Sequence, residues 1–326
     1  MPNWKEVLQE IQNTGSAHDV VRRQYLTRLN ELTDRNVIVY YSAWLEKGAF
    51  LRNVQSILAV NDSDKNGLMA AIHNLDKSKG LDLILHTPGG DLSATESIVD
   101  YLRSIFGTNI RAVVPQIAMS AGTMIALSCE KIILGKHSNL GPIDPQIGGV
   151  PAHGVIEEFN QAKAEVLANP ATAMIWQPII AKYSPTLVGQ CVKAIDWSES
   201  MVKEWLKTGM FAGEADAQAK ADSIVQELGS HALTKSHARH ISLDRAKNLG
   251  IKVITLEEDP ALQDAVLAVH HACIHTLAHT PAVKIIENHI GAAFIPGLQQ
   301  AMQASPQSSQ SPSSDQTLAV PWGSWG

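Results

Sequence analysis

Ser120 stands at a predicted strand-to-helix turn, between an apolar run at Ile110–Pro115 and a run of small residues at Ala121–Ser128. A side chain at the start of a helix lies near the positive end of the helix dipole, where developing negative charge is stabilised. A serine hydroxyl in such a place becomes a nucleophile when a neighbouring base removes its proton. Ser120 is therefore the best candidate nucleophile in the chain.

A second segment could supply hydrogen-bond donors for acyl transfer. The sequence His86-Thr87-Pro88-Gly89-Gly90-Asp91 follows the apolar run Leu81–Leu85. Paired glycines let backbone N–H groups turn toward a ligand where a Cβ atom would interfere. Alone, Pro-Gly-Gly is ordinary turn chemistry. Together with the N–H of Ala121, however, Gly89 or Gly90 would complete an oxyanion hole beside Ser120.

Alternating apolar runs and helical patterns predict the frame that must position these residues. An entry helix over Asp19–Asp34 precedes a strand, and two further helix-and-strand pairs follow before the serine turn. Apolar strands separated by helices indicate an α/β fold with a mainly parallel sheet that is covered on both faces. The predicted strands are Val37–Trp44, Leu81–Leu85, Ile110–Pro115 and Lys131–Leu134, with helices at Asp64–Leu75 and Leu92–Phe106.

The chain divides into four predicted parts. From Val155 to about Leu228 the pattern is almost wholly helical, which indicates a helical insertion beside the sheet. The polar stretch after Gly297 has too few apolar residues to offset the entropy of ordering it. We therefore predict an N-terminal helical segment (1–34), a main domain (35–258) with a helical insertion at about 155–230, a C-terminal helical segment (259–297) and a disordered tail (298–326).

Composition excludes several functions. With 326 residues, a net charge of −6 and a pI near 6.1, the chain has no basic surface for nucleic acid. The three cysteines, Cys129, Cys191 and Cys273, are widely spaced, which disfavours a disulfide framework or a cysteine zinc site. No apolar stretch is long enough to cross a membrane, and no signal peptide is evident. We expect a protein of the reducing cytoplasm without a membrane anchor.

Three histidines recur at helical spacing near the C-terminus. His271, His275 and His279 fall on one face of a predicted helix, but Ala272 stands where the metalloprotease signature needs glutamate. We interpret them as half-buried helix residues and predict neither a metal nor any other cofactor.

A polar stretch covers the start of one of the predicted helices. The residues from Asp62 to Gly67 match the first half of a calcium-binding loop, but His73 stands where the bidentate glutamate belongs. We interpret this stretch as a polar turn and helix cap.

Three motifs resemble those of a known family. They are Thr-Pro-Gly-Gly at 87–90, Ala-Met-Ser-Ala-Gly-Thr at 118–123 and Leu-Gly-Pro-Ile-Asp-Pro-Gln at 140–146. In this order they resemble the serine dehydrogenase proteinase family, distant relatives of the ClpP and SppA peptidases in the ClpP/crotonase superfamily. The resemblance covers roughly residues 30–256. It implies a ClpP/crotonase-like spiral of βαβ units and a serine peptidase with a triad in the order Ser, Asp, His.

The resemblance also implies roles for particular residues. Ser120 would be the nucleophile, Asp144 the acid, and His237, in Thr-Lys-Ser-His-Ala-Arg-His-Ile at 234–241, the base. The family pattern has threonine before this histidine, whereas the present chain has serine, and the segment holds several histidines. His240 and His231 therefore remain alternative bases.

Other interpretations stay open at this stage. SppA-like relatives use a Ser–Lys dyad, and Lys163 lies about where such a lysine would enter. A catalytically silent peptide-binding scaffold and a crotonase-type acyl-CoA enzyme are the other two readings. As a peptidase the protein would act on peptides or unfolded proteins, form a homo-oligomer as its relatives do, and depend on a separate protein for any ATP-driven unfolding, because it has no P-loop.

Overall fold

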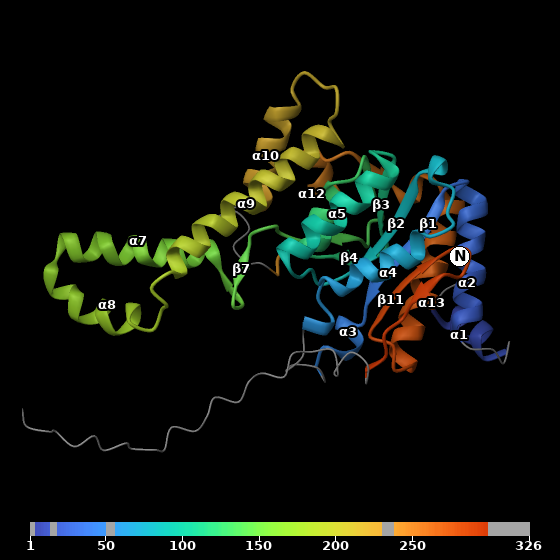
Figure 1. Cartoon of the computed structure of the whole chain (residues 1–326), viewed down its shortest axis with the longest axis horizontal. Helices are drawn as coiled ribbons and strands as arrows, with labels where there is room; N and C mark the ends of the chain where they lie inside the picture. The colour runs from blue at the N-terminus through green and yellow to red at the C-terminus, as the bar shows by residue number, and fades with distance from the viewer. Residues whose placement is uncertain (1–3, 14–17, 50–55, 230–237, 299–326) are drawn as a thin grey trace, which may run out of the picture.

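The structure is a computed structural model that describes residues 4–13, 18–49, 56–229 and 238–298. Its centre is a seven-stranded sheet with the order β10-β5-β3-β2-β1-β11-β12 (Figure 1). The pairs from β10 to β1 are parallel, whereas β11 and β12 are antiparallel. The strands span Asn36–Ser42 (β1), Leu81–His86 (β2), Ile110–Val114 (β3), Lys131–Leu134 (β5), Val253–Thr255 (β10), Lys284–Asn288 (β11) and Ala293–Phe294 (β12).

Strands β1 and β2 are buried along their whole length because helices cover both faces of the sheet. Alternate β1 residues point to opposite faces, so that Ile38 and Tyr40 enter one core and Val39 and Tyr41 enter the other. Helices α4 (Ser63–Ile72), α5 (Leu92–Phe106) and α6 (Ala121–Leu127) cover the first face, and α2 (His18–Thr33) and α13 (Pro260–His279) cover the second. The near-continuous apolar strands in the sequence are the signature of this arrangement.

The helical insertion forms an arm that projects from the sheet (Figure 1). The start of α9 lies in the arm with α7 and α8, whereas its end packs with α10 on the core through Val202, Leu206 and Ile224. The helices are α7 (Ala152–Ala168), α8 (Ala173–Ile180), α9 (Leu187–Thr208) and α10 (Ala217–Gly229), entered through β7 (Gln146–Ile147) and β8 (Val150–Pro151). The predicted helical insertion is therefore present.

The C-terminal part differs from the sequence expectation. Helix α13 occupies the first part of the predicted helical segment 259–297, but the chain then returns as strand β11, which pairs antiparallel with β1 inside the main sheet. The expectation of helix alone missed this strand because its apolar core, Ile285 and Ile286, is too short to show a period. The predicted disordered tail lies almost wholly outside the described residues.

The remaining elements are short. They comprise α1 (Trp4–Asn13), α3 (Trp44–Lys47), α12 (Leu243–Asn248) and a small sheet of β4 (Ile117–Ala118), β6 (Asn139–Leu140) and β9 (Ile241–Ser242). Within the described ranges, no helix is both long and apolar enough to span a membrane.

Candidate active site

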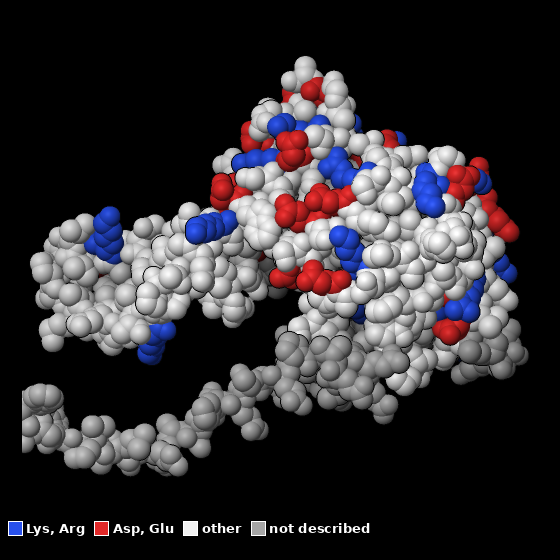
Figure 2. Space-filling view, in the orientation of Figure 1, with Lys and Arg blue, Asp and Glu red and all other residues white. Residues whose placement is uncertain are grey.

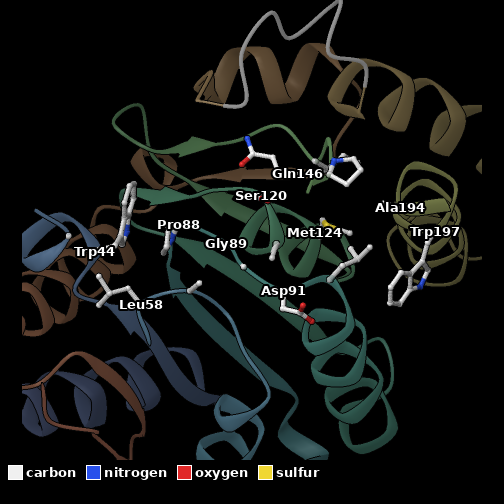
Figure 3. A pocket seen from close by; sticks show the side chains of 17 residues that line it. Trp44, Leu58, Pro88, Gly89, Asp91, Ser120, Met124, Gln146, Ala194 and Trp197 are labelled. Carbon is white, nitrogen blue, oxygen red and sulfur yellow. The ribbon is translucent and has the colours of Figure 1, made fainter. Parts of the chain in front are cut away.

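A pocket of about 580 Å³ opens where the parallel strands β1 and β2 end (Figure 3). The Pro-Gly-Gly loop and Ser120 form its floor, and Trp197 of α9 stands at one side. Its lining consists of Trp44, Gly48, Leu58, Ala59, Pro88, Gly89, Gly90, Asp91, Leu92, Ser120, Ala121, Met124, Ile143, Pro145, Gln146, Ala194 and Trp197. The two motifs predicted to cooperate therefore meet in one pocket.

Ser120 occupies a strained turn between β4 and α6. Its φ of 49° and ψ of −116° are rare for a residue with a side chain, and its hydroxyl makes no capping hydrogen bond to the helix. Neighbouring bonds hold the turn: Thr123 donates to the Ala118 carbonyl (2.8 Å), and the Met124 N–H donates to the Ser120 carbonyl (3.0 Å). The strain leaves the hydroxyl in the pocket instead of folded back on the helix.

Gly89 packs directly against Ser120. A Cβ atom at Gly89 would lie 2.6 Å from the Ser120 Cβ and 2.9 Å from the Ala121 nitrogen, and its φ is +96°. Only glycine fits such an approach. The Gly89 N–H donates to the Thr87 hydroxyl (3.2 Å), whereas in the described part of the chain the N–H groups of Gly90 and Ala121 donate to no protein atom. Gly90 and Ala121 therefore carry the donors available to a ligand.

Asp144 lies in the loop that follows β6, between two residues of the pocket lining. It is fully buried, and its chain neighbours Ile143 and Pro145 both line the pocket that holds Ser120. The loop before it is tied to α6, because the Gly141 N–H donates to the Thr123 hydroxyl at 2.8 Å. The motifs with the predicted nucleophile and the predicted acid are thus joined by a direct hydrogen bond.

His237 and His231 lie outside the described residues, but the residues on both sides of segment 230–237 are described. On one side, the Leu228 carbonyl accepts a hydrogen bond from the Ile143 N–H (2.9 Å). On the other, Ile241 of β9 pairs antiparallel with Leu140 of β6. Both flanks are therefore attached to the chain around Asp144. His240 is described and is exposed.

Lys163 lies on α7 in the projecting arm (Figure 1). Its side chain is exposed, and it is not among the residues that line the pocket. The structure does not bring this lysine to Ser120.

The histidines of α13 differ in burial: His275 is fully buried, His271 is half-buried and His279 is exposed, so the expectation of half-buried residues holds for His271 alone. His270 contacts the Tyr41 hydroxyl through Nδ1 (3.1 Å), His275 contacts the Trp4 carbonyl (3.1 Å), and His279 contacts the His275 carbonyl (2.9 Å). Within the described ranges, no group of three or more His, Cys, Asp or Glu residues is arranged to hold a metal ion.

His86, the last residue of β2, is buried directly before the Thr-Pro-Gly-Gly motif. The centroid of its ring lies 5.2 Å from the centroid of the Tyr41 ring and 5.7 Å from that of the His270 ring. Neither ring nitrogen of His86 has a hydrogen-bond partner among the described residues. Burial lowers the pKa of His86 to about 3, so the ring stays neutral in the folded protein. Its sequence position alone gave no sign of this burial.

The neutral state of His86 predicts acid sensitivity. The pKa of His86 is near 6.5 in the unfolded chain and about 3 in the folded protein. Between these two pH values the unfolded state therefore binds more protons than the folded state does. The free energy of unfolding should drop by up to about 1.4 kcal/mol per pH unit from this residue. Urea titrations at several pH values should show a shallower drop for His86→Phe than for the wild type. An equal pH dependence of the unfolding free energy in the two proteins would contradict a lowered pKa of His86.

Comparisons with known proteins agree with this geometry. Residues 9–263 match the family described as ClpP-like SDH-type serine proteinase. An uncharacterized protein of Methanocaldococcus jannaschii is 31% identical over 241 residues, which are 73% of this chain and 78% of that protein. A second uncharacterized protein of the same organism is 31% identical over 202 residues, 62% of this chain and 61% of the relative. The chain therefore belongs to the ClpP-like SDH-type serine proteinase family.

Among solved structures, the chain is similar to an asparagine-to-aspartate mutant of ClpP1 from Listeria monocytogenes. The TM-score is 0.36 at 17% identity, over 72% of this chain and 98% of that chain. Family membership confirms the predicted ClpP-like α/β fold, and it places the protein in a family of serine proteinases.

Proposed function

We propose that the protein is a serine endopeptidase that uses Ser120 as its nucleophile. The observation that carries this proposal is the strained Ser120 turn, packed against Gly89 in a pocket where two backbone N–H groups have no protein acceptor among the described residues. A nucleophile beside preorganised donors is the arrangement that acyl transfer requires.

The proposed reaction has two halves. The Ser120 oxygen attacks the scissile carbonyl while His237 removes the hydroxyl proton, and the N–H groups of Gly90 and Ala121 bind the resulting oxyanion. His237 then protonates the leaving amine, and the peptide C–N bond breaks to give an acyl-enzyme. In the second half His237 takes a proton from water, the hydroxide attacks the ester, and Ser120 leaves with its proton restored. Water is the second reactant, and its oxygen ends in the carboxylate of the released peptide.

Asp144 is proposed to orient His237 and to stabilise its positively charged form. This role is supported by the burial of Asp144 behind the pocket and by the attachment of both flanks of segment 230–237 to the chain around it. A buried carboxylate can hold the histidine in the tautomer that accepts the serine proton.

The pocket lining favours substrates with apolar side chains. Leu92, Met124, Ile143 and Trp197 line the pocket together with Ser120, and the one acid of the lining, Asp91, already accepts a hydrogen bond from the Ala94 N–H (2.8 Å) at the start of α5. Unfolded proteins and peptides expose such side chains in extended form, so they are the proposed substrates.

Self-association is a further part of this proposal. Helix α8 is apolar but has no buried residue, and three large side chains of the arm are strongly exposed: Leu167 (75%), Met174 (83%) and Ile175 (64%). Large exposed apolar groups of this kind mark interaction surfaces. We propose that the arm packs against other copies of the chain.

Hydrolysis of an unfolded protein tests both the function and the identity of the base. With fluorescently labelled casein, the wild type should release peptides, and His237→Ala should lose at least about a hundredfold in rate, because general-base catalysis is worth that much. His231→Ala, His240→Ala and Lys163→Ala are matched variants that should retain activity. Loss with one of these three instead would move the base to that residue. Binding of casein without cleavage by the wild type would favour the silent scaffold.

A further inference from the structure

An ion pair is buried beneath the pocket, between strand β11 and helix α4. The Lys284 ammonium contacts both carboxylate oxygens of Asp64, at 2.7 and 2.8 Å, and the two side chains are 2% and 0% exposed. Tyr40 of β1 donates its hydroxyl to Asp64 at 2.6 Å. Desolvation lowers the pKa of Lys284 although Asp64 opposes this shift. Burying two charges is costly, and an apolar pair of similar size often gives equal stability.

The same ion pair binds the backbone of segment 59–61. The Lys284 ammonium donates to the Ala59 carbonyl (2.6 Å), and the Asn61 N–H donates to Asp64 (2.9 Å). One residue earlier, the Ser42 hydroxyl donates to the Leu58 carbonyl at 2.6 Å. Hydrogen bonds to charged groups are stronger than neutral ones, so this segment is firmly fixed on both sides of Val60.

Val60 in turn pairs with the glycine loop. Its N–H donates to the Gly89 carbonyl (2.8 Å), and its carbonyl accepts from the Asp91 N–H (2.9 Å). A Cβ atom at Gly90 would lie 2.3 Å from the Val60 nitrogen, so the two backbones are in direct contact. A continuous set of contacts therefore runs from the ion pair through Val60 to Gly90 and Ser120.

We infer that Lys284 and Asp64 are positioning residues, which fix segment 59–61 and through it the N–H group of Gly90 that faces the reacting carbonyl oxygen. This inference rests on the proposed function. Oxyanion donors act only when they are held at the correct place before the reaction, and small displacements are expensive. Lys284 lies beyond the residues that match the family, 9–263, so the C-terminal strand β11 supplies part of the support for the site.

The test replaces the pair without leaving a buried charge. Lys284→Met with Asp64→Asn keeps nearly the same side-chain volumes. It removes the hydrogen bond from the ammonium to the Ala59 carbonyl, and it replaces the carboxylate that accepts from the Asn61 N–H with a neutral amide. We expect the rate of fluorophosphonate labelling of Ser120, followed by intact mass, to fall about 10- to 100-fold, a part of the value of one oxyanion donor. The loss should lie in the maximal inactivation rate, with the half-saturating fluorophosphonate concentration changed less than about twofold, because the donors act in the transition state.

A second buried ion pair on β11 provides the matched control. Glu287 binds Arg22 at 2.6 Å with both side chains 0% exposed. Among the described residues their other hydrogen bonds go to Asp19, Arg23 and Thr276, which lie outside segment 59–61. Arg22→Met with Glu287→Gln should therefore label at the wild-type rate. Ser42→Ala is a milder variant, in case the double change at Lys284 and Asp64 prevents folding. It should slow labelling about threefold through loss of the bond to Leu58.

The possible results distinguish failure of the positioning role from failure of the peptidase proposal. Labelling of the Lys284→Met, Asp64→Asn protein at the wild-type rate, or equal slowing of both double variants, would overturn the positioning role and leave the peptidase proposal intact. If the double variant does not fold, an unchanged rate for Ser42→Ala would overturn it instead. A wild-type protein that is not labelled on Ser120 would refute the proposed function itself.

Discussion

Ser120→Ala is expected to reduce hydrolysis of an unfolded protein to the background of the assay, a loss of about 10⁵- to 10⁶-fold in kcat. The change removes the only atom that forms the acyl-enzyme in the proposed mechanism. It should leave the fold unchanged, because the Ser120 hydroxyl makes no capping bond to α6 and alanine adds no atoms to the pocket. Peptide release measured by mass spectrometry, with the melting temperature measured on the same sample, gives the comparison.

Ser128→Ala is the control at the other end of the same helix. Its hydroxyl donates to the Ile125 carbonyl (2.7 Å), one turn back, and Ser128 is not among the residues that line the pocket, so the change is small. This variant should hydrolyse at the wild-type rate. Retention of full hydrolysis by Ser120→Ala would contradict the mechanism and would favour a chemistry without a serine nucleophile, such as that of crotonase-type enzymes.

Asp144→Asn is expected to lower kcat by about 10⁴-fold with little change in KM. Asparagine has nearly the same shape as aspartate, so the buried site should remain packed. Its amide can hold the histidine in the wrong tautomer, and it cannot stabilise the positive charge that develops on the ring. Steady-state hydrolysis of a fluorogenic peptide, once one is found from the casein fragments, measures the effect.

Asp259→Asn is a suitable control for the loss of a carboxylate. Asp259 caps α13 by accepting from the Ala261 and Leu262 N–H groups (3.1 and 3.0 Å), and asparagine caps helices equally well. Its activity and melting temperature should match the wild type. An Asp144→Asn protein that keeps more than a tenth of the wild-type kcat would show that another group orients the base.

The sequence was informative where function depends on local backbone geometry. A serine between an apolar strand and a run of small residues predicted the turn at Ser120, and the structure shows a positive φ there. Paired glycines predicted N–H donors for a ligand, whereas the contact of Gly89 with Ser120 was not predicted. Local patterns did not, however, distinguish Gly89 from Gly90 as a donor. That distinction depends on the hydrogen bond from the Gly89 N–H to Thr87.

The sequence was less informative where function depends on contacts between distant segments. Asp64 was expected in a polar turn and helix cap, and the helix does begin at Ser63, but Asp64 is buried against a lysine 220 positions away. Nothing near Asp64 in the chain indicates that partner. The direction of the arm likewise depends on how α9 packs on the core, because helical spacing gives the face of a helix and not its angle to a sheet.

The surface gives no competing site of strong charge on the face that is seen. Figure 2 shows lysine, arginine, aspartate and glutamate side chains interspersed over α10, the end of α9 and the main domain, with few on the arm. The exposed apolar arm and the pocket at its base are therefore the two features that the proposed function uses.

The most direct test of the central claim is the mass of the intact native protein after treatment with a fluorophosphonate, followed by peptide mapping. We expect a single adduct, located on Ser120, that is abolished by prior unfolding in urea because only the assembled site activates the hydroxyl. A folded and assembled protein that gains no adduct, or gains it on a serine other than Ser120, would contradict the proposed peptidase mechanism.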